Sequence, residues 1–151
     1  MLPNRSVPAS SVIPVLAYAD VAAASDWLCE AFGFRERLRV GDHRAQLVYG
    51  NGAVIVTEGA SPPATVHVRV EDAAAHHDRA RANGAQITSE PTDYPYGERQ
   101  YTAVDPGGHH WTFSESIADV DPESWGGTPA DDDTDWVSVF SAADDADLTP
   151  P

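Results

Sequence analysis

The feature that most constrains the fold is a weak internal repeat, in which two segments each contain an apolar strand followed by a helix. In the first copy a strand ends at Asp20 and VAAASDWLCEAFGF follows; in the second, a strand ends at Asp72 and AAAHHDRARANGAQI follows. Asp20 precedes Gly33 by 13 residues, and Asp72 precedes Gly84 by 12 residues. Asp caps helix N-termini by accepting from free N–H groups, and Gly suits the left-handed position past a helix end. Both segments therefore predict capped helices of similar length.

Three strand-like runs follow each predicted helix. The first set is 34–41, 44–50 and 53–58. The second set is 85–89, then a long loop 90–97, then 98–105 and 109–115, the last two joined by the turn Asp105-Pro106-Gly107-Gly108. A repeat of about 50 residues is typical of a duplicated supersecondary unit. The sequence therefore predicts an α+β fold of two βαβββ modules, 12–60 and 64–118, after an N-terminal extension of residues 1–11.

The charge of the chain argues against two classes of partner. The chain has 24 acidic residues, nine arginines and no lysine, with a formal net charge of −15. Such a field repels phosphate backbones and anionic lipid headgroups, so we expect no nucleic acid and no membrane partner. One cysteine, Cys29, excludes an internal disulfide. With no signal-like or membrane-spanning apolar run, the expected location is the cytoplasm.

Residues 119–151 differ from the rest in composition. They carry ten of the acidic residues and are rich in Asp, Ala, Pro and Gly. We expect an acidic C-terminal tail, mobile in part, with an apolar cluster from Trp136 to Phe140.

Three segments of the repeat carry a resemblance to a known family. VIPVLAYADVAAASDWLCEAFGF (12–34) resembles the opening strand and helix of a vicinal-oxygen-chelate module, and VHVRVEDAAAHHDRARANGA (66–85) is similar to the start of the second module. YGERQYTAVDPGGHHWTFSE (96–115) resembles the closing hairpin of glyoxalase-like and bleomycin-resistance-like members of this superfamily, which also includes extradiol dioxygenases. The resemblance, over about residues 12–118, implies a curved mixed sheet with outer helices, a concave ligand cavity, and a homodimer with the pocket between subunits.

The resemblance also bears on metal binding. In metal-using members, four strand positions supply His or Glu ligands, and these positions fall here on Ile13, Val56, Thr65 and Thr112. Val and Ile have no lone pair to donate, and Thr rarely binds a divalent metal alone. We therefore expect no metal and no cofactor. An alternative is a displaced metal site made of Glu58, His67 and His110.

Strand alternation gives an independent set of candidate ligand-binding residues. Apolar side chains should pack under the helices, and polar ones should line the concave side. The polar set is Thr65, His67 and Arg69 on one strand and His110, Thr112 and Ser114 on another. Glu58 is placed on the same face as Val56, nearer the mouth. The alternative is a polar face that is simply solvated. The adjacent pairs His76-His77 and His109-His110 are expected to be structural.

The predicted loop from Pro91 to Arg99 is a second candidate. Tyr94 and Tyr96, held by prolines, could form a stiff aromatic wall for a flat ligand, and Arg99 could pair with an anionic group on that ligand. The alternative is a loop that packs its own tyrosines on the surface.

These features leave three hypotheses for function, and whether the protein is an enzyme stays open. The first is a metal-independent small-molecule binding protein of the bleomycin-resistance type. The second is a glyoxalase-like lyase or isomerase with His67 or His110 as general base and Arg69 or Arg99 holding the oxyanion. The third is a non-catalytic interaction protein that acts through its acidic tail.

A last expectation concerns the tail itself. Arg35, Arg37 and Arg39 alternate along one predicted strand, so all three should point to one face. The acidic tail could dock across this strand with Trp136 and Phe140 as apolar anchors. The alternative is a solvated arginine face and a free tail.

Overall fold

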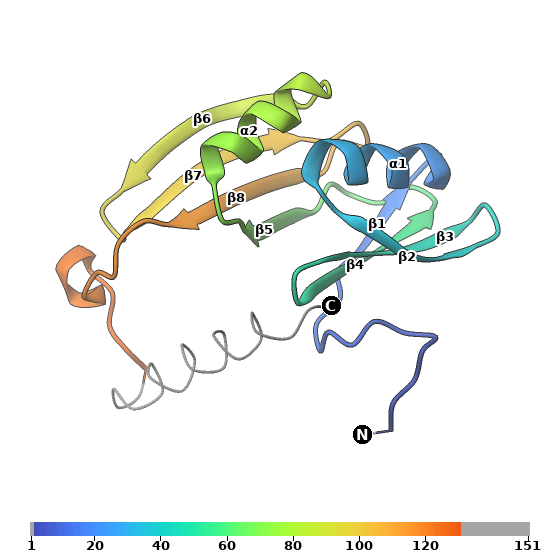
Figure 1. Ribbon diagram of the computed structural model, residues 1–151, viewed down its shortest axis with the longest axis horizontal. Coiled ribbons are helices and arrows are strands. Elements are labelled where there is room, and N and C mark those ends of the chain that lie inside the picture. Colours follow the sequence, from blue (N-terminus) through green and yellow to red (C-terminus); the bar gives the residue numbers. More distant parts are fainter. Residues whose placement is uncertain (1, 131–151) are drawn as a thin grey trace.

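Two four-stranded sheets lie beneath two helices in the computed structural model, which describes residues 2–130 (Figure 1). The first module contains β1 (Val15–Tyr18), α1 (Val21–Phe32), β2 (Arg35–Val40), β3 (Arg44–Tyr49) and β4 (Gly52–Glu58), in the sheet order β1-β4-β3-β2, here called sheet A. The second contains β5 (Thr65–Arg69), α2 (Ala73–Ala82), β6 (Gln86–Tyr94), β7 (Glu98–Val104) and β8 (His110–Ser116), in the order β5-β8-β7-β6, called sheet B. A 3₁₀ helix, Pro122–Trp125, follows. The predicted α+β fold of two βαβββ units is confirmed.

The predicted caps begin both helices. The Asp20 carboxylate accepts from the N–H of Ala23, and the Asp72 carboxylate accepts from the N–H of Ala75, each at 3.0 Å. Helix α1 ends at Gly33 in the left-handed conformation, with φ of 82°. The caps fix where each helix begins, and the end of α1 as well.

The core lies between the helices and the sheets. Phe32 of α1 packs against Trp111 and Phe113 of β8 with tilted rings, whose centroids are 5.3 and 4.7 Å away, and all three rings are fully buried. Burial of each such side chain contributes about 1.5–3 kcal/mol relative to leaving it exposed. The prediction that the apolar strand faces pack under the helices is therefore right for β8. Neither helix within residues 2–130 has the length and apolar character needed to cross a bilayer.

Strand β6 is longer than the sequence indicated. The segment 90–97 was expected to be a loop, but β6 runs to Tyr94 and pairs with β7 up to Tyr94 opposite Glu98. Pro91 is tolerated because β6 is an edge strand and its pairing is irregular between Ser89 and Thr92. The two tyrosines therefore sit at a hairpin end and not in a long loop.

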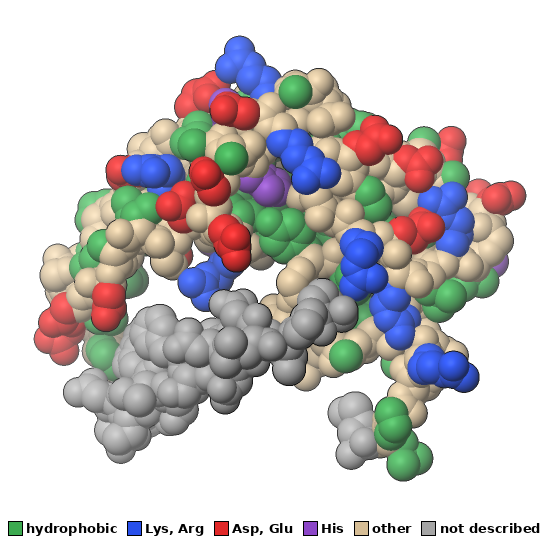
Figure 2. Space-filling model, viewed as in Figure 1, with side chains coloured by type: hydrophobic (Ala, Val, Ile, Leu, Met, Phe, Trp, Pro, Cys, Tyr) green, Lys and Arg blue, Asp and Glu red, His purple; other side chains and the backbone are tan. Residues whose placement is uncertain are grey.

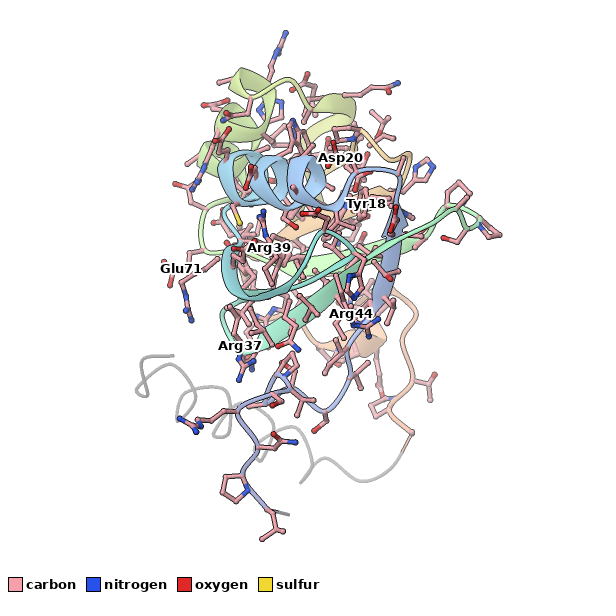
Figure 3. The ribbon with its side chains drawn as sticks, turned by 90° about the vertical axis from the view of Figure 1, so that its right-hand side faces the viewer. Tyr18, Asp20, Arg37, Arg39, Arg44 and Glu71 are labelled. Atoms are coloured by element: carbon pink, nitrogen blue, oxygen red, sulfur yellow. The ribbon has the colours of Figure 1, made fainter. Side chains whose placement is uncertain are left out.

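A β-bulge in β2 corrects the expectation that three alternate arginines share a face. Pairing with β3 shifts between Glu36 and Leu38, so Arg37 is the extra residue. The Arg37 guanidinium donates to Oε1 of Gln46 on the outer side of sheet A, whereas Arg39 reaches Asp26 of α1 on the helix side. Figure 3 shows Arg37 below the strands and Arg39 above them. The segment with Trp136 and Phe140, expected to dock on this strand, lies outside the described residues.

The two modules meet through a buried polar joint. The Tyr18 hydroxyl of β1 donates to Oδ2 of Asp105 at 2.5 Å. His109 accepts from the N–H of Ala64 through Nδ1 at 2.9 Å, and its Nε2 lies 2.8 Å from the carbonyl oxygen of Ala17. That carbonyl can only accept, so Nε2 carries the proton and His109 is a neutral, structural histidine.

The N-terminal extension crosses the outer side of sheet A. Arg37 donates to the carbonyl oxygen of Arg5 at 2.7 Å, and Gln46 donates to that of Ser6 at 2.9 Å. Pro8 is buried, and the Ser10 hydroxyl donates to the carbonyl oxygen of Asn51. The segment is therefore held through its backbone carbonyls at Arg5 and Ser6 and through the side chains of Pro8 and Ser10.

Candidate functional site

The pairing of β5 with β8 brings six predicted site residues onto one face of sheet B. Residues opposite each other in neighbouring strands point to the same side of a sheet. The opposite pairs are Thr65 with His110, His67 with Thr112, and Arg69 with Ser114. The residues between them in β8 are buried under the helices, so these six side chains point away from the helices.

Sequence reasoning missed the part of this face that β7 supplies. Gln100 lies opposite Ser114, Thr102 opposite Thr112, and Glu98 opposite Ser116. The alternation of apolar and polar residues in β7 could have identified them. Tyr101 and Ala103 are buried on one side of the strand, so Glu98, Gln100 and Thr102 lie on the other. We define the polar face as the side chains of Thr65, His67, Arg69, Glu98, Gln100, Thr102, His110, Thr112, Ser114 and Ser116.

Hydrogen bonds within the polar face hold several of its groups in place. Nε2 of His67 lies 2.7 Å from Oγ of Ser114, which is fully buried and so anchors the imidazole. Arg69 donates to Oγ of Ser116 at 3.1 Å, and that hydroxyl donates to Oε2 of Glu98 at 3.3 Å. Such a face offers fixed donors and acceptors.

The positive charge of Arg69 is not neutralised by an ion pair within residues 2–130. Its one hydrogen-bond partner there is the neutral hydroxyl of Ser116. An anionic or strongly electron-rich group could therefore bind the exposed guanidinium.

An aromatic cluster lies at the end of the polar face. Tyr94 is opposite Glu98 in the sheet, so its side chain leaves on the polar side. The rings of Tyr94 and Tyr96 are stacked, with centroids 5.4 Å apart and planes 7° apart, and Trp125 meets Tyr96 edge to face at 5.5 Å. Trp125, from the 3₁₀ helix, is 46% exposed and was not among the predicted site residues. The cluster presents flat apolar surface beside polar groups.

Arg99, expected in a loop where it could pair with an anionic group of the ligand, lies in β7 on the helix side of sheet B. It pairs with Glu115 in β8, and Glu115 accepts from the N–H of Ala73 at the start of α2, on the helix side of sheet B. Its guanidinium donates to both carboxylate oxygens of Asp93, at 2.7 and 3.2 Å. The hydrogen bond from Arg99 lowers the pKa of Asp93. Arg99 is therefore already paired and does not belong to the polar face.

The placement of Glu58 rested on a register that is wrong by one residue. Val56 was expected to face the ligand, but it is fully buried in the core, and the outer side of β4 carries Ile55 and Thr57. Glu58 follows Val56 on the core side of the strand and is exposed at the strand end. The ligand positions carried over from metal-using relatives thus include one, Val56, that points into the core.

The alternative metal site of Glu58, His67 and His110 does not form. Within residues 2–130, no group of three or more His, Cys, Asp or Glu side chains converges as metal ligands would. The geometric reason is that Glu58 leaves β4 on its core side, whereas His67 and His110 lie on the polar face of sheet B.

A separate open cavity of about 570 Å³ lies at the junction of the modules. It is lined by the start of α1 with Trp27, by the segment Gly59–Ser61 and by the turn Pro106–Gly107. Two of its polar side chains are already engaged, since Asp20 caps α1 and Tyr18 donates to Asp105. We place the candidate site on the polar face, because its groups converge and all but Ser114 remain at least partly exposed.

Residues 12–113 match the model of the glyoxalase/bleomycin resistance protein/dioxygenase superfamily. With the two βαβββ modules, this match shows that the chain belongs to that superfamily.

Among solved structures, TioX from Micromonospora sp. ML1 is 36% identical, with a TM-score of 0.66, covering 72% of this chain and 99% of that one. A lactoylglutathione lyase from Agrobacterium tumefaciens shares the fold at 16% identity, with a TM-score of 0.61 over 79% of this chain and 98% of that one. An uncharacterized protein of Mycobacterium tuberculosis is 28% identical over 127 residues, which span 71% of this chain and 75% of the relative.

Proposed function

We propose that the protein binds a small molecule on the polar face of sheet B without the help of a metal. The observation that carries the proposal is the convergence of polar side chains from β5, β7 and β8 on one face with accessible donors and acceptors. Family membership supports a small-molecule role, because members of this superfamily use the sheet face opposite the helices for ligands. The homodimer and the cytoplasmic location remain predictions.

The proposed ligand is a flat aromatic compound that carries polar substituents. The aromatic cluster of Tyr94, Tyr96 and Trp125 offers a flat surface for stacking, and stacked or edge-on ring pairs contribute about 0.5–1.5 kcal/mol beyond area burial. Thr112, Gln100 and Arg69 would then receive the polar substituents.

The test is isothermal titration calorimetry with a panel of planar heteroaromatic compounds, followed by variants measured with whichever compound binds. Gln100→Ala should weaken binding about fivefold, because loss of one hydrogen bond is worth about 1 kcal/mol. Arg99→Gln is the matched control, since Arg99 lies on the helix side, and it should leave the dissociation constant unchanged. Equal effects of both variants, or no binding across the panel, would refute the proposal.

A second candidate function is a glyoxalase-like lyase or isomerase with His67 as general base. It is favoured by the anchoring of His67 on buried Ser114. In the described part of the chain, however, no carboxylate pairs with His67, so no acidic group orients it or stabilises its charged form. Turnover of an α-ketoaldehyde that is lost in His67→Gln would favour the enzyme. Stoichiometric transition metal in purified protein would overturn the metal-free proposal.

A further inference from the structure

The open cavity of about 570 Å³ between the modules, here called the junction cavity, lies beside α1 and away from the polar face. Its floor is the end of β1, and one wall is the segment 59–61 with the turn Pro106–Gly107. The other wall is one side of α1, formed by residues spaced i, i+3, i+4 and i+7, which are Asp20, Ala23, Ala24 and Trp27. The short alanine side chains leave room between the two walls.

Trp27 presents a fixed aromatic surface to the junction cavity. Its indole N–H donates to the carbonyl oxygen of Asn83, just after α2, at 2.9 Å, and its ring meets Phe32 edge to face with centroids 4.8 Å apart. The side chain is nevertheless only half-buried. Because its polar N–H is already bonded elsewhere, Trp27 offers the cavity its π surface, which attracts cations as well as apolar groups.

The charged groups at the junction cavity are negative. Asp20 is exposed, caps α1 through Oδ1, and forms no ion pair within residues 2–130. Its full charge exceeds the roughly half positive charge of a helix N-terminus. The buried carboxylate of Asp105 accepts from two lining residues, through the hydroxyl of Tyr18 and the N–H of Gly107. None of the described residues that line the cavity is basic.

The helix beside the junction cavity has the same sign of charge. Helix α1 contains Asp26 and Glu30 and no arginine, and Figure 2 shows acidic side chains over it. Figure 3 shows Tyr18 and Asp20 beside the start of α1, with Arg44 on the other side of the strands. The cavity should therefore attract a cation and repel an anion.

The second module repeats the cap without the aromatic side chain. Asp72 begins α2 as Asp20 begins α1, but the residue seven positions after the cap is Arg79 in place of Trp27. Arg79 donates to two backbone carbonyl oxygens near the end of α1. A carboxylate beside an aromatic surface is thus a property of α1, and α2 supplies matched control positions in the same chain.

We propose that the junction cavity binds an organic cation, in which a protonated or quaternary amine is joined to an aromatic group. The ammonium lies near the carboxylate of Asp20, and the aromatic group packs against Trp27 and the alanines of α1. This site is separate from the polar face of sheet B, where Arg69 favours the opposite charge.

The test is an NMR titration of the full chain at low salt with benzyltrimethylammonium. The indole N–H of Trp27 and the amides of Ala23 and Gly107 should shift and saturate, with a dissociation constant below about 1 mM. Phenylmethanesulfonate, an anion of similar shape, should cause no saturable shift of these signals.

Two pairs of variants separate charge from shape. Asp20→Asn removes the charge and keeps a good N-cap, so it should weaken binding of benzyltrimethylammonium about fivefold, the upper end for an exposed ion pair. Asp72→Asn is its control and should leave the dissociation constant unchanged. Ala23→Leu fills the cavity and should abolish the shifts, whereas Ala75→Leu, three residues after the other cap, should not.

Three outcomes would overturn the proposal. They are the absence of saturable shifts with the cation, equal binding of cation and anion, and equal effects of Asp20→Asn and Asp72→Asn. Gln100→Ala, which tests the polar face, should leave binding of benzyltrimethylammonium unchanged. A failure of the proposed function on sheet B can therefore be told from a failure at the junction cavity.

Discussion

The hydroxyl of Tyr18, on the first strand of the first module, donates a hydrogen bond to the carboxylate of Asp105, 87 residues away, in the last hairpin of the second. Asp105 is 4% exposed and accepts from three further donors, the indole N–H of Trp111 and the backbone N–H groups of Gly107 and His109. Four neutral donors thus stabilise one buried carboxylate. Burial, and then the charge of Asp105, raises the pKa of Tyr18 far above its ordinary value.

Tyr18→Phe should lower the free energy of unfolding by about 1.5–3 kcal/mol, since the lost hydrogen bond reaches a charged group. Denaturant unfolding followed by circular dichroism measures the change. Tyr49→Phe is the control, because Tyr49 is half-buried and its hydroxyl makes no hydrogen bond in the described part of the chain. A loss in Tyr18→Phe no larger than in Tyr49→Phe would show that the joint contributes nothing to stability.

Gly107→Ala should also destabilise the joint. A Cβ at residue 107 would lie 2.5 Å from Cδ2 of Tyr18, and the ring cannot move without breaking its bond to Asp105. Overpacking of this kind costs about 1–3 kcal/mol. Gly52→Ala is the comparison, since its nearest neighbour would lie at 3.4 Å. Thermal unfolding of the two variants should differ by several degrees, and equal melting temperatures would count against a tight contact.

The stability of the protein should fall as the pH decreases from about 7 to 5, in part because of His76. Nε2 of His76 lies 2.7 Å from the carbonyl oxygen of Phe32, which can only accept, so Nδ1 of the neutral ring accepts from Tyr101. Burial lowers the pKa of His76, and Arg79 lowers it further. The unfolded state therefore binds a proton more readily than the folded state below the ordinary pKa, and stability present above that pKa is lost as the pH falls.

The contribution of His76 is measured as the difference between wild type and His76→Gln in unfolding free energy across this pH range. The variant should be less stable at pH 7 and should show a shallower dependence on pH. If the unfolding free energy of the wild type and of His76→Gln changed with pH in parallel, His76 would bind its proton equally well in the folded and unfolded states.

Arg99→Gln should raise the pKa of Asp93 toward its ordinary value, since the hydrogen bond from Arg99 is the largest cause of the depression. NMR titration of the Asp93 carboxyl carbon follows this directly. Asp93→Asn should in turn leave binding on the polar face unchanged, because the pair lies on the helix side of sheet B. Weaker ligand binding in Asp93→Asn would show that the Asp93–Arg99 pair contributes to binding on the polar face after all.

The features that were predictable from sequence are those that repeat or alternate. The caps at Asp20 and Asp72, and the alternation around Trp111, are set by local chemistry and strand period. The predictions that failed are those that depend on a shift of one residue. The bulge at Arg37 and the register of Val56 cannot be recognised from composition, yet each moves a side chain to the other face of the sheet. The contact of Trp125 with Tyr96 could not be predicted, because Trp125 lies outside the repeat and its position relative to sheet B is not set by the repeat pattern.

The joint of Tyr18 and Asp105 has a consequence for how the duplicated halves recognise each other. The hydroxyl comes from one half and the carboxylate from the other, and the corresponding turn in the first half, Gly50-Asn51-Gly52, has no carboxylate. Two first halves cannot make this contact, and neither can two second halves, so the joint selects unlike halves. The same hydrogen bonds would form, however, between halves of one chain and between halves of two chains that exchanged modules. Within this chain the joint forms across the short connection of residues 59–64, with its two adjacent prolines.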